Sequence, residues 1–332
     1  MTVWVGVVAR ARGLSGRLLS PAALAELAPS TDLRDLGTRL AARRARPAPE
    51  AVSARSLEDD ERRHYGAQLR LLAHWSGAHV NLLAPLFDDE DRRSLRTVLR
   101  GAVAGVPATD RLAGLIPTPA LPMRALDQLA SCDLQAAIAA LLVAWGNPYG
   151  PPLVAETSRQ NPDLFQIEHS LVSTWATRAR RAARRGDRAM RAFVKRQLDL
   201  ANLWTALLVA EHGFDGPAGS LFIEGGALIR RGDLEQAAAA KSRSRAVEIL
   251  DKLVRQSPLA AATGVGDNVE ERVRHALIRE QRAIARQQPL STAPIIEFWL
   301  RLRAEAAAIR RVIWSIAAGV PAAARALEPV EA

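Results

Sequence analysis

The amino-acid sequence predicts an all-α protein with an internal threefold repeat, and three observations carry that prediction. Apolar residues recur at helical spacing through most of the chain, no stretch of useful length alternates apolar and polar residues, and one helical pattern occurs three times. A chain of 332 residues with 48% hydrophobic content can bury a large core and form two or three subdomains. We therefore expect residues 1–332 to form one helical domain with three pseudo-equivalent lobes.

The repeated pattern consists of a carboxylate, an apolar residue four positions later and a closing glycine. Its three copies are Asp91, Leu95 and Gly105; Asp199, Leu203 and Gly213; and Glu305, Ile309 and Gly319. The carboxylates lie 108 and then 106 residues apart, and such a fixed period indicates one supersecondary unit used three times. We expect the three carboxylates to occupy equivalent places and to accept hydrogen bonds or pair with arginine. We expect the glycines to end the helices in the left-handed conformation.

A second motif shares this period and opens each repeat. Leu18-Leu19 precedes Ser20 and Pro21, which predict the N-cap and first turn of a short helix. Residues 121–130 and 228–238 echo this segment. The approximate repeats are therefore 10–105, 115–213 and 222–319.

The approach to the second and third copies is also similar. Residues 115–121, Leu-Ile-Pro-Thr-Pro-Ala-Leu, match residues 222–228, Phe-Ile-Glu-Gly-Gly-Ala-Leu. Gly225-Gly226 predicts a tight turn rather than a phosphate cradle, because no strand precedes it.

The other elements follow from apolar periodicity and from glycine or proline breaks. A short helix in 29–45 is followed by a loop at 46–50. The further helices are expected at 57–86, after Asp91, at 136–145, within 162–208, at 241–256, at 268–288 and from Pro294 to Gly319.

The charge balance is basic, with 45 lysines and arginines against 35 acidic residues and a net charge of +10. Only Lys195, Lys241 and Lys252 are lysines, and this preference for arginine is typical of a GC-rich coding bias rather than of phosphate binding. The net charge favours acidic partners or anionic surfaces. The dense run from Arg178 to Arg188 is either a solvated helix end and turn or an anion-binding patch.

The sequence contains no pair of cysteines for a disulfide and no apolar run long enough to span a bilayer. The single cysteine, Cys132, excludes an intrachain disulfide and is typical of a small core residue. The longest apolar run, 136–145, is about half of what a bilayer span needs. The apolar N-terminus precedes Arg10 and Arg12, the reverse of signal-peptide order. We expect a soluble cytoplasmic protein, although not necessarily one that works away from membranes.

The acidic run Phe87-Asp-Asp-Glu-Asp91 invites comparison with the magnesium motif of terpene synthases. That motif needs an aspartate where Arg92 stands, and in the partner motif, Asn202, Thr205 and Glu211, the acid falls two positions late. No paired metal-binding histidines, phosphate loop or nucleophile elbow is present in the sequence. The sequence therefore predicts no catalytic, cofactor or metal site, and a terpene-synthase-like enzyme is the least favoured alternative.

In this order and at this period, the motifs resemble the C subunits of bacterial and archaeal V/A-type ATPases, the equivalents of the eukaryotic d subunit. The residues that carry the resemblance are 10–28, Tyr149-Gly150, Asp199, Asn202, Leu203, residues 222–228 with Gly225 and Gly226, Glu305, Ile309, Arg310 and Gly319. The sequence departs from the family at Ser94 and Ala308, where an asparagine is usual, and at Ser315-Ile316, where the family has Gly-Lys.

The resemblance implies three helical lobes arranged as a funnel and a non-catalytic adaptor in proton or sodium transport. Its partners would be the proteolipid rotor ring of the membrane and the central-stalk subunits, with the stalk tip held in the funnel. Asp91, Leu95, Asp199, Asn202, Leu203, Gly225, Gly226, Glu305 and Arg310 would be structural motif residues. The alternative is a helical-repeat protein that binds nucleic acid, favoured by the sequence pI near 11 and the Arg178–Arg196 region.

Overall fold

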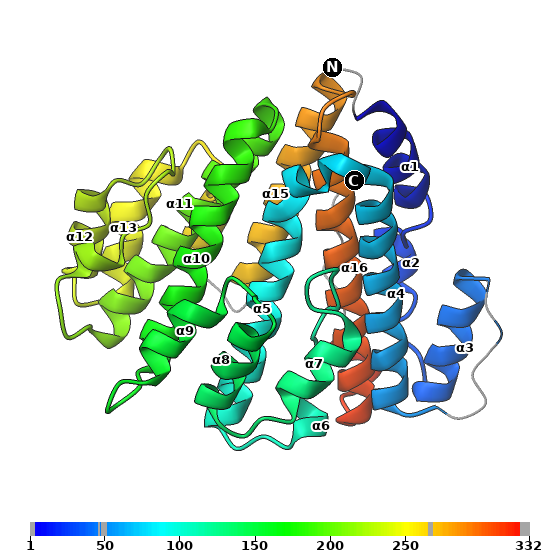
Figure 1. Cartoon of the computed structure of the whole chain (residues 1–332). Helices are drawn as coiled ribbons and strands as arrows, with labels where there is room; N and C mark the ends of the chain where they lie inside the picture. Colours follow the sequence, from blue (N-terminus) through cyan, green and yellow to red (C-terminus); the bar gives the residue numbers. More distant parts are fainter. Residues whose placement is uncertain (1–3, 46, 48–51, 265–267, 326–332) are drawn as a thin grey trace.

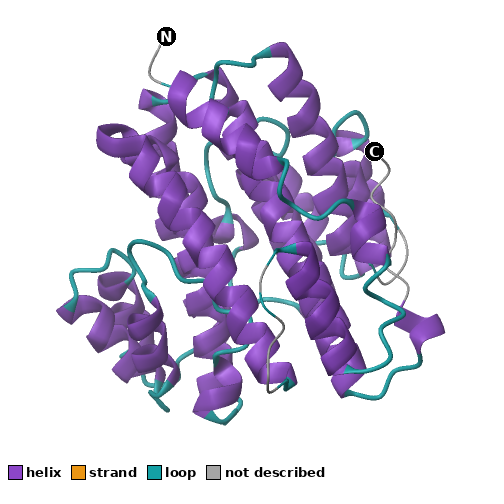
Figure 2. Cartoon of the chain, turned by 90° about the vertical axis from the view of Figure 1, so that its right-hand side faces the viewer, coloured by secondary structure: helices purple, strands orange, loops and turns teal. Residues whose placement is uncertain are grey.

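The computed structural model describes residues 4–45, 47, 52–264 and 268–325, and within them every regular element is a helix (Figures 1 and 2). The predicted all-α class is confirmed. Six long helices make up the centre of the molecule: α4 (Ala54–Ser76), α5 (Ala84–Val103), α10 (Leu164–Arg185), α11 (Arg188–His212), α15 (Val269–Gln287) and α16 (Ala293–Ala317).

Shorter helices lie at the edges and ends of these six (Figure 1). They are α1 (Val5–Ser15), α2 (Pro21–Ala25), α3 (Leu33–Arg43), α6 (Ala108–Arg111), α7 (Met123–Ala130), α8 (Gln135–Ala144), α9 (Gly150–Thr157), α12 (Arg231–Ala238), α13 (Arg243–Val254) and α14 (Ala260–Thr263). Two 3₁₀ segments lie between helices, η1 (Gly77–Leu83) and η2 (Ala218–Leu221), and a third, η3 (Ala322–Arg325), follows α16.

Two of the helices expected from the sequence differ from those in the structure. The single helix expected at 57–86 is wrong, because Gly77 takes a φ of +50° and ends α4, and η1 then leads into α5 with Pro85 in its first turn. The helical stretch 162–208 is two helices, since Asp187 caps α11 by accepting from the N–H of Met190 at 2.9 Å. The loop expected at 46–50 lies, apart from Pro47, outside the described residues.

The predicted helix ends are found with one difference. Ser20 caps α2 by accepting a hydrogen bond from the N–H of Ala23 at 3.1 Å. Gly105 and Gly319 are left-handed, at φ +63° and +70°, and the next residue after each donates back to the carbonyl five positions earlier. Gly213 also has a positive φ, +78°, but its ψ of 173° turns the chain away directly from α11.

Each of α5, α11 and α16 has short helices packed against it. Helix α5 contacts α6, α7 and α8; α11 contacts η2, α12 and α13; and α16 contacts α1, α2 and α3. A separate apolar cluster joins Leu36 and Leu40 of α3 to Ile309 and Ile313 of α16. The N-terminal short helices therefore pack on the C-terminal long helix. The three-lobed arrangement itself stays a prediction.

Candidate functional site

Asp199 of α11 holds the loop that leads into α12. Its side chain is fully buried, and its carboxylate accepts hydrogen bonds from the backbone N–H groups of Ala227, Leu228 and Ile229 at 3.0, 3.0 and 3.1 Å. Three backbone donors on one buried carboxylate satisfy groups that would otherwise be left unpaired beside the helix. Asp199 thus fixes residues 227–229 against α11.

Asn202, one turn further along α11, holds the start of the same loop. Its side-chain oxygen accepts from the N–H of Ile223 at 2.9 Å, and its amide donates to the Ile223 carbonyl at 2.8 Å. Gly225, at φ +106°, and Gly226 make the turn that the sequence predicted. A Cβ at Gly226 would lie 2.2 Å from an oxygen of Asp199, so the close approach of loop and carboxylate requires glycine there.

Asp91 of α5 holds the corresponding loop through a side-chain hydroxyl. Its carboxyl accepts a hydrogen bond from the Thr118 hydroxyl at 2.5 Å. The Thr118 hydroxyl oxygen in turn accepts from the N–H groups of Ala120 and Leu121 at 3.2 and 3.0 Å. Burial raises the pKa of Asp91 to about 8, although the Thr118 hydrogen bond acts in the opposite direction. The Thr118 hydroxyl therefore bridges the Asp91 carboxyl and the backbone of the loop.

Ser94 replaces the asparagine of the Asp-x-x-Asn pattern and keeps half of its contacts. Its hydroxyl oxygen accepts from the N–H of Ile116 at 3.1 Å, as Asn202 accepts from the N–H of Ile223. The departure from the family pattern at this position thus retains one backbone hydrogen bond.

Glu305 of α16 receives the N-terminal loop. One carboxylate oxygen accepts from the N–H of Leu19 at 2.9 Å, and the other pairs with Arg44 at 3.1 Å. Arg44 also pairs with Glu61 of α4 at 2.8 Å. Burial raises the pKa of Glu305, with Arg44 opposing the rise. Ala308, one turn along, offers no polar group, so the ion pair takes the place of the amide contact.

The apolar members of the pattern, Leu95, Leu203 and Ile309, are all fully buried. The structure does not bring the three carboxylates together in one pocket; each contacts a different loop. Their equivalence stays a prediction, but each accepts a hydrogen bond from a segment that leads into a short helix.

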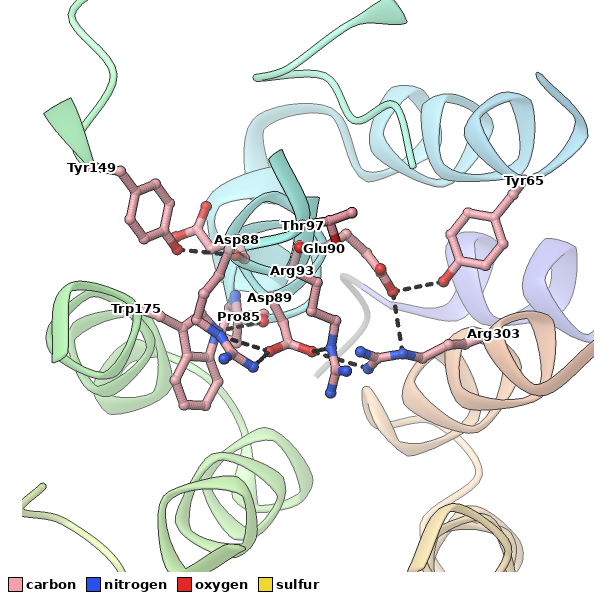
Figure 3. A network of polar contacts seen from close by, with 11 residues as sticks. Tyr65, Pro85, Asp88, Asp89, Glu90, Arg93, Thr97, Tyr149, Trp175 and Arg303 are labelled. Atoms are coloured by element: carbon pink, nitrogen blue, oxygen red, sulfur yellow. Dashed lines mark hydrogen bonds and ion pairs between the residues drawn. The ribbon is translucent and has the colours of Figure 1, made fainter. Parts of the chain in front are cut away.

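The acidic run 88–91 forms one turn near the start of α5, and all four side chains are buried. Figure 3 shows three of them, Asp88, Asp89 and Glu90. We call Asp88, Asp89, Glu90 and Asp91 the buried acidic turn. Successive residues of a helix point about 100° apart, so four in a row face almost every direction around the axis. Because each acid faces a different neighbour, this turn of α5 is enclosed on all sides.

Two of these acids join α5 to α10 and α16. Asp88 pairs with Arg178 of α10 at 2.7 Å, and Asp89 pairs with Arg303 of α16 at 3.0 Å. Asp89 also forms ion pairs with Arg92 and Arg93 of its own helix, at 2.5 and 2.9 Å. The backbones of α5 and α16 barely approach each other, so these two helices are connected through long side chains.

Glu90 joins α5 to α4. It accepts a hydrogen bond from the hydroxyl of Tyr65 at 2.7 Å and lies 3.8 Å from Arg303 (Figure 3). Two further hydrogen bonds reach the α5 backbone beside it, from Tyr149 to the Asp88 carbonyl at 2.9 Å and from Trp175 to the Pro85 carbonyl at 3.1 Å.

The four acids differ in how strongly burial affects them. Burial raises the pKa of Asp88 and Glu90 despite Arg178 and Arg303. Burial also opposes ionisation of Asp89, but Arg92 and Arg303 outweigh it and lower the pKa of that carboxyl. Asp89 is therefore the one of these three carboxyls whose ionised form the neighbouring arginines favour over burial.

Arg310 lies at a separate junction near the end of α16. It pairs with Glu58 of α4 at 3.1 Å, a contact that lacks the alignment of a hydrogen bond. Glu58 also accepts from the indole N–H of Trp314 and from the N–H of Gly114, both at 2.6 Å. Glu58 thus connects α4, α16 and the loop after α6.

The buried acids connect helices and loops through ion pairs and hydrogen bonds. Within the part of the chain that the structure describes, no three His, Cys, Asp or Glu side chains gather as metal ligands. In the run that resembles a magnesium motif in sequence, Asp88 and Asp89 pair with arginines on other helices. Glu90 and Asp91 accept hydrogen bonds from Tyr65 and Thr118.

Several residues of these junctions were missed by sequence reasoning. Arg303, Arg44 and Thr118 carry long-range contacts, and nothing in local periodicity distinguishes them from other polar residues. One feature of the sequence could have identified Thr118 as the partner of a carboxylate. It stands between two prolines, Pro117 and Pro119, which have no N–H to offer a carboxylate.

These features define a helical scaffold whose buried charges connect helices to one another. The family model of the ATP synthase (C/AC39) subunit matches residues 7–325, so the chain belongs to this family of V/A-type ATPase subunits. The family is a non-catalytic component of the ATPase complex. No curated protein matches the chain. Among the described helices, none is both long enough and apolar enough to span a membrane.

Proposed function

We propose that this protein is the adaptor that links the central stalk of a V/A-type ATPase to its membrane rotor ring. Family membership supports a place in that complex. The specific linking role follows from the mechanical requirement that an adaptor pass torque between two partners without bending. The molecule must then resist relative movement of its long helices.

The observation that carries the proposal is the buried acidic turn. It connects α5 to α4, α10 and α16 through Tyr65, Arg178 and Arg303, whose contacts with the turn are 2.7–3.0 Å long. Buried charge pairs are geometrically demanding, and removing one partner costs about 3–5 kcal/mol because the other is left uncompensated. Sliding one of these helices past α5 would break such pairs, so the turn opposes shear.

We further propose that the chain forms three lobes that close on themselves. The supporting contacts are those of Asp91, Asp199 and Glu305, each of which receives the loop before a set of short helices. The third of these loops is N-terminal and the helix that holds it is C-terminal. Such closure would suit a funnel that encloses a stalk tip, with the ring at the lobe ends.

Copurification tests the linking role. A tagged chain isolated from native membranes is expected to bring down both the proteolipid ring and the central-stalk subunits, and its deletion is expected to uncouple ATP hydrolysis from ion movement. Recovery of the tagged chain alone, with normal pumping by membranes that lack it, would refute the proposal.

A substitution sharpens the same test. Arg303→Met removes the link between α5 and α16, and we expect complexes that assemble but couple less tightly. Arg279→Met is the matched control, because Arg279 is exposed and no ion pair joins it to a described carboxylate. A thermal unfolding curve of each purified variant separates weaker coupling from failure to fold. Equal coupling in a folded Arg303→Met complex would mean that the buried acidic turn does not transmit torque.

A further inference from the structure

Most of the net charge lies in one short segment. Residues 178–196 contain nine arginines and lysines and a single acid, Asp187, which amounts to +8 of the total of +10. Arg178, Arg180 and Arg196 pair with carboxylates. The other six are exposed and make no ion pair with any carboxylate in the described residues: Arg181, Arg184, Arg185, Arg188, Arg191 and Lys195.

The turn between α10 and α11 lies beside the turn between α15 and α16. Asp187 accepts hydrogen bonds from both the N–H and the hydroxyl of Thr292, each at 2.6 Å. Both turns are at the upper end of the molecule in Figure 1. The second turn exposes Pro289 and Leu290, the latter with 53% of its surface accessible, and Arg286 is exposed on the last turn of α15.

This end of the molecule therefore combines an apolar tip with surrounding arginines. We call Arg184, Arg185, Arg188, Arg191, Arg286, Pro289 and Leu290 the basic tip. Near an anionic bilayer each arginine contributes about 1 kcal/mol of attraction, and an exposed leucine at the point of contact can enter the headgroup boundary.

We propose that the basic tip binds the headgroups of anionic phospholipids directly. The contact is made by this chain alone, so the proposal goes beyond assembly with other subunits of an ATPase. A basic surface held on a bilayer would orient the molecule with the α10–α11 and α15–α16 turns toward the membrane.

The composition of the basic tip favours lipid over nucleic acid. Binding of single strands relies on aromatic side chains that stack on bases, and the basic tip has none. Its arginines are exposed instead of buried in a pocket, which suits a fluid layer of headgroups. An exposed apolar side chain next to basic ones is a further feature of protein surfaces that bind membranes.

Cosedimentation with protein-free vesicles tests the proposal. The purified full chain is expected to bind phosphatidylcholine vesicles that contain phosphatidylglycerol, to release them at high salt, and to ignore vesicles of phosphatidylcholine alone. The triple variant Arg184→Gln, Arg185→Gln, Arg188→Gln is expected to bind anionic vesicles roughly 100-fold more weakly, from three lost attractions.

A matched control removes the same charge elsewhere. Arg34, Arg124 and Arg245 are exposed and make no ion pair with a described carboxylate, so Arg34→Gln, Arg124→Gln, Arg245→Gln is expected to bind almost as well as the unmodified chain. Leu290→Ser is expected to lose roughly tenfold in affinity while keeping its salt dependence, because partial burial of leucine contributes about 1.5 kcal/mol.

Three outcomes would overturn the proposal. These are equal losses in the two triple variants, absence of binding to anionic vesicles, and binding of an oligonucleotide through the same arginines without any binding of vesicles. Because no other subunit is present, none of these results bears on the stalk-to-ring role, and failure of copurification would leave the lipid result standing.

Discussion

The loops before α12 and α7 are each fixed to a long helix by a buried carboxyl, Asp199 and Asp91, but the groups that donate hydrogen bonds to the two carboxyls differ. In the Asp199 site, three backbone N–H groups reach the carboxylate directly. In the Asp91 site, the corresponding N–H groups of Ala120 and Leu121 reach only Thr118, whose hydroxyl donates to the carboxyl. One site has a carboxylate that acts purely as an acceptor of N–H groups, and the other has a carboxyl whose pKa burial raises to about 8.

The cause lies in four residues of the loops. Ile223-Glu-Gly-Gly becomes Ile116-Pro-Thr-Pro, so Gly226 of one loop corresponds to Pro119 of the other. A Cβ at Gly226 would already lie 2.2 Å from Asp199, and a proline ring is larger still. The loop before α7 must therefore stand further from its helix, and a threonine hydroxyl fills the gap. The same architecture thus tolerates loss of a close approach when a short polar side chain replaces it.

The largest expected effect comes from making the same substitution in both sites. Asp199→Asn keeps an oxygen at the position of Oδ1, which accepts from all three N–H groups, but it removes the charge and places an NH₂ group at Oδ2, against the N–H of Ala227. We expect about 3 kcal/mol of destabilisation in urea unfolding near neutral pH, from three weaker hydrogen bonds and one pair of opposed donors. Destabilisation below about 1 kcal/mol would mean that the loop finds other acceptors.

Asp91→Asn is expected to have the opposite sign near neutral pH. The pKa of Asp91 is about 8 in the folded protein and about 3.9 in the unfolded chain, so the folded state binds more protons between these values. Stability that is fully present below pH 4 is therefore lost as the pH rises through 8, by up to about 1.4 kcal/mol per unit. Asparagine does not titrate and avoids this loss.

The measurement is the free energy of unfolding of both proteins from pH 4 to pH 9. The variant is expected to match the unmodified chain near pH 4 and to exceed it by about 4 kcal/mol at pH 7. Asp88, Glu90 and Glu305, whose pKa values are also raised, contribute to both curves, so only the difference reports on Asp91. A difference that does not change with pH would show that Asp91 is ionised in the folded protein.

A smaller effect is expected from closing the gap at the Asp199 site. Gly226→Ala places a methyl group against the carboxylate and should destabilise by about 1–3 kcal/mol, as overpacking does. Gly232→Ala is the matched control, because nothing lies within 4 Å of its Cβ position in α12, and there we expect a gain of about 0.5–1 kcal/mol. Equal effects from the two substitutions would contradict the close approach at Gly226.

Sequence reasoning predicted the class of fold because helical periodicity and end signals act locally. Ser20, Gly105 and Gly319 end or begin helices as expected, since each position depends only on its own few neighbours. The prediction of one long helix at 57–86 was wrong because the apolar spacing continues past Gly77 without a break. The positive φ of Gly77 depends instead on how η1 packs. Packing of the N-terminal helices on α16 joins residues nearly 300 positions apart, beyond the reach of any local pattern.

The candidate site was predicted only in part. The repeat identified Asp91, Asp199 and Glu305 as residues with a shared place in the pattern, and each does receive a loop. The partners differ because they come from elsewhere in the chain: a hydroxyl, three N–H groups, or an N–H with Arg44. In sequence, the buried acidic turn invited comparison with a magnesium motif, because two of its arginine partners, Arg178 and Arg303, are supplied by distant helices.

The last prediction tests the hydroxyl that distinguishes the two sites. Thr118→Val keeps the shape of a fully packed side chain but leaves Ala120 and Leu121 without an acceptor, which should cost about 1–3 kcal/mol. Because the Thr118 hydrogen bond lowers the pKa of Asp91, its loss should also move the upper end of the pH-dependent range above 8. Thr118→Ser keeps the hydroxyl, so its curve should end near pH 8 even if it loses about 1 kcal/mol with the methyl group. A valine variant with an unchanged pH range would show that the hydroxyl satisfies the loop without acting on Asp91, and the contrast between the two sites would then rest on the loop backbone alone.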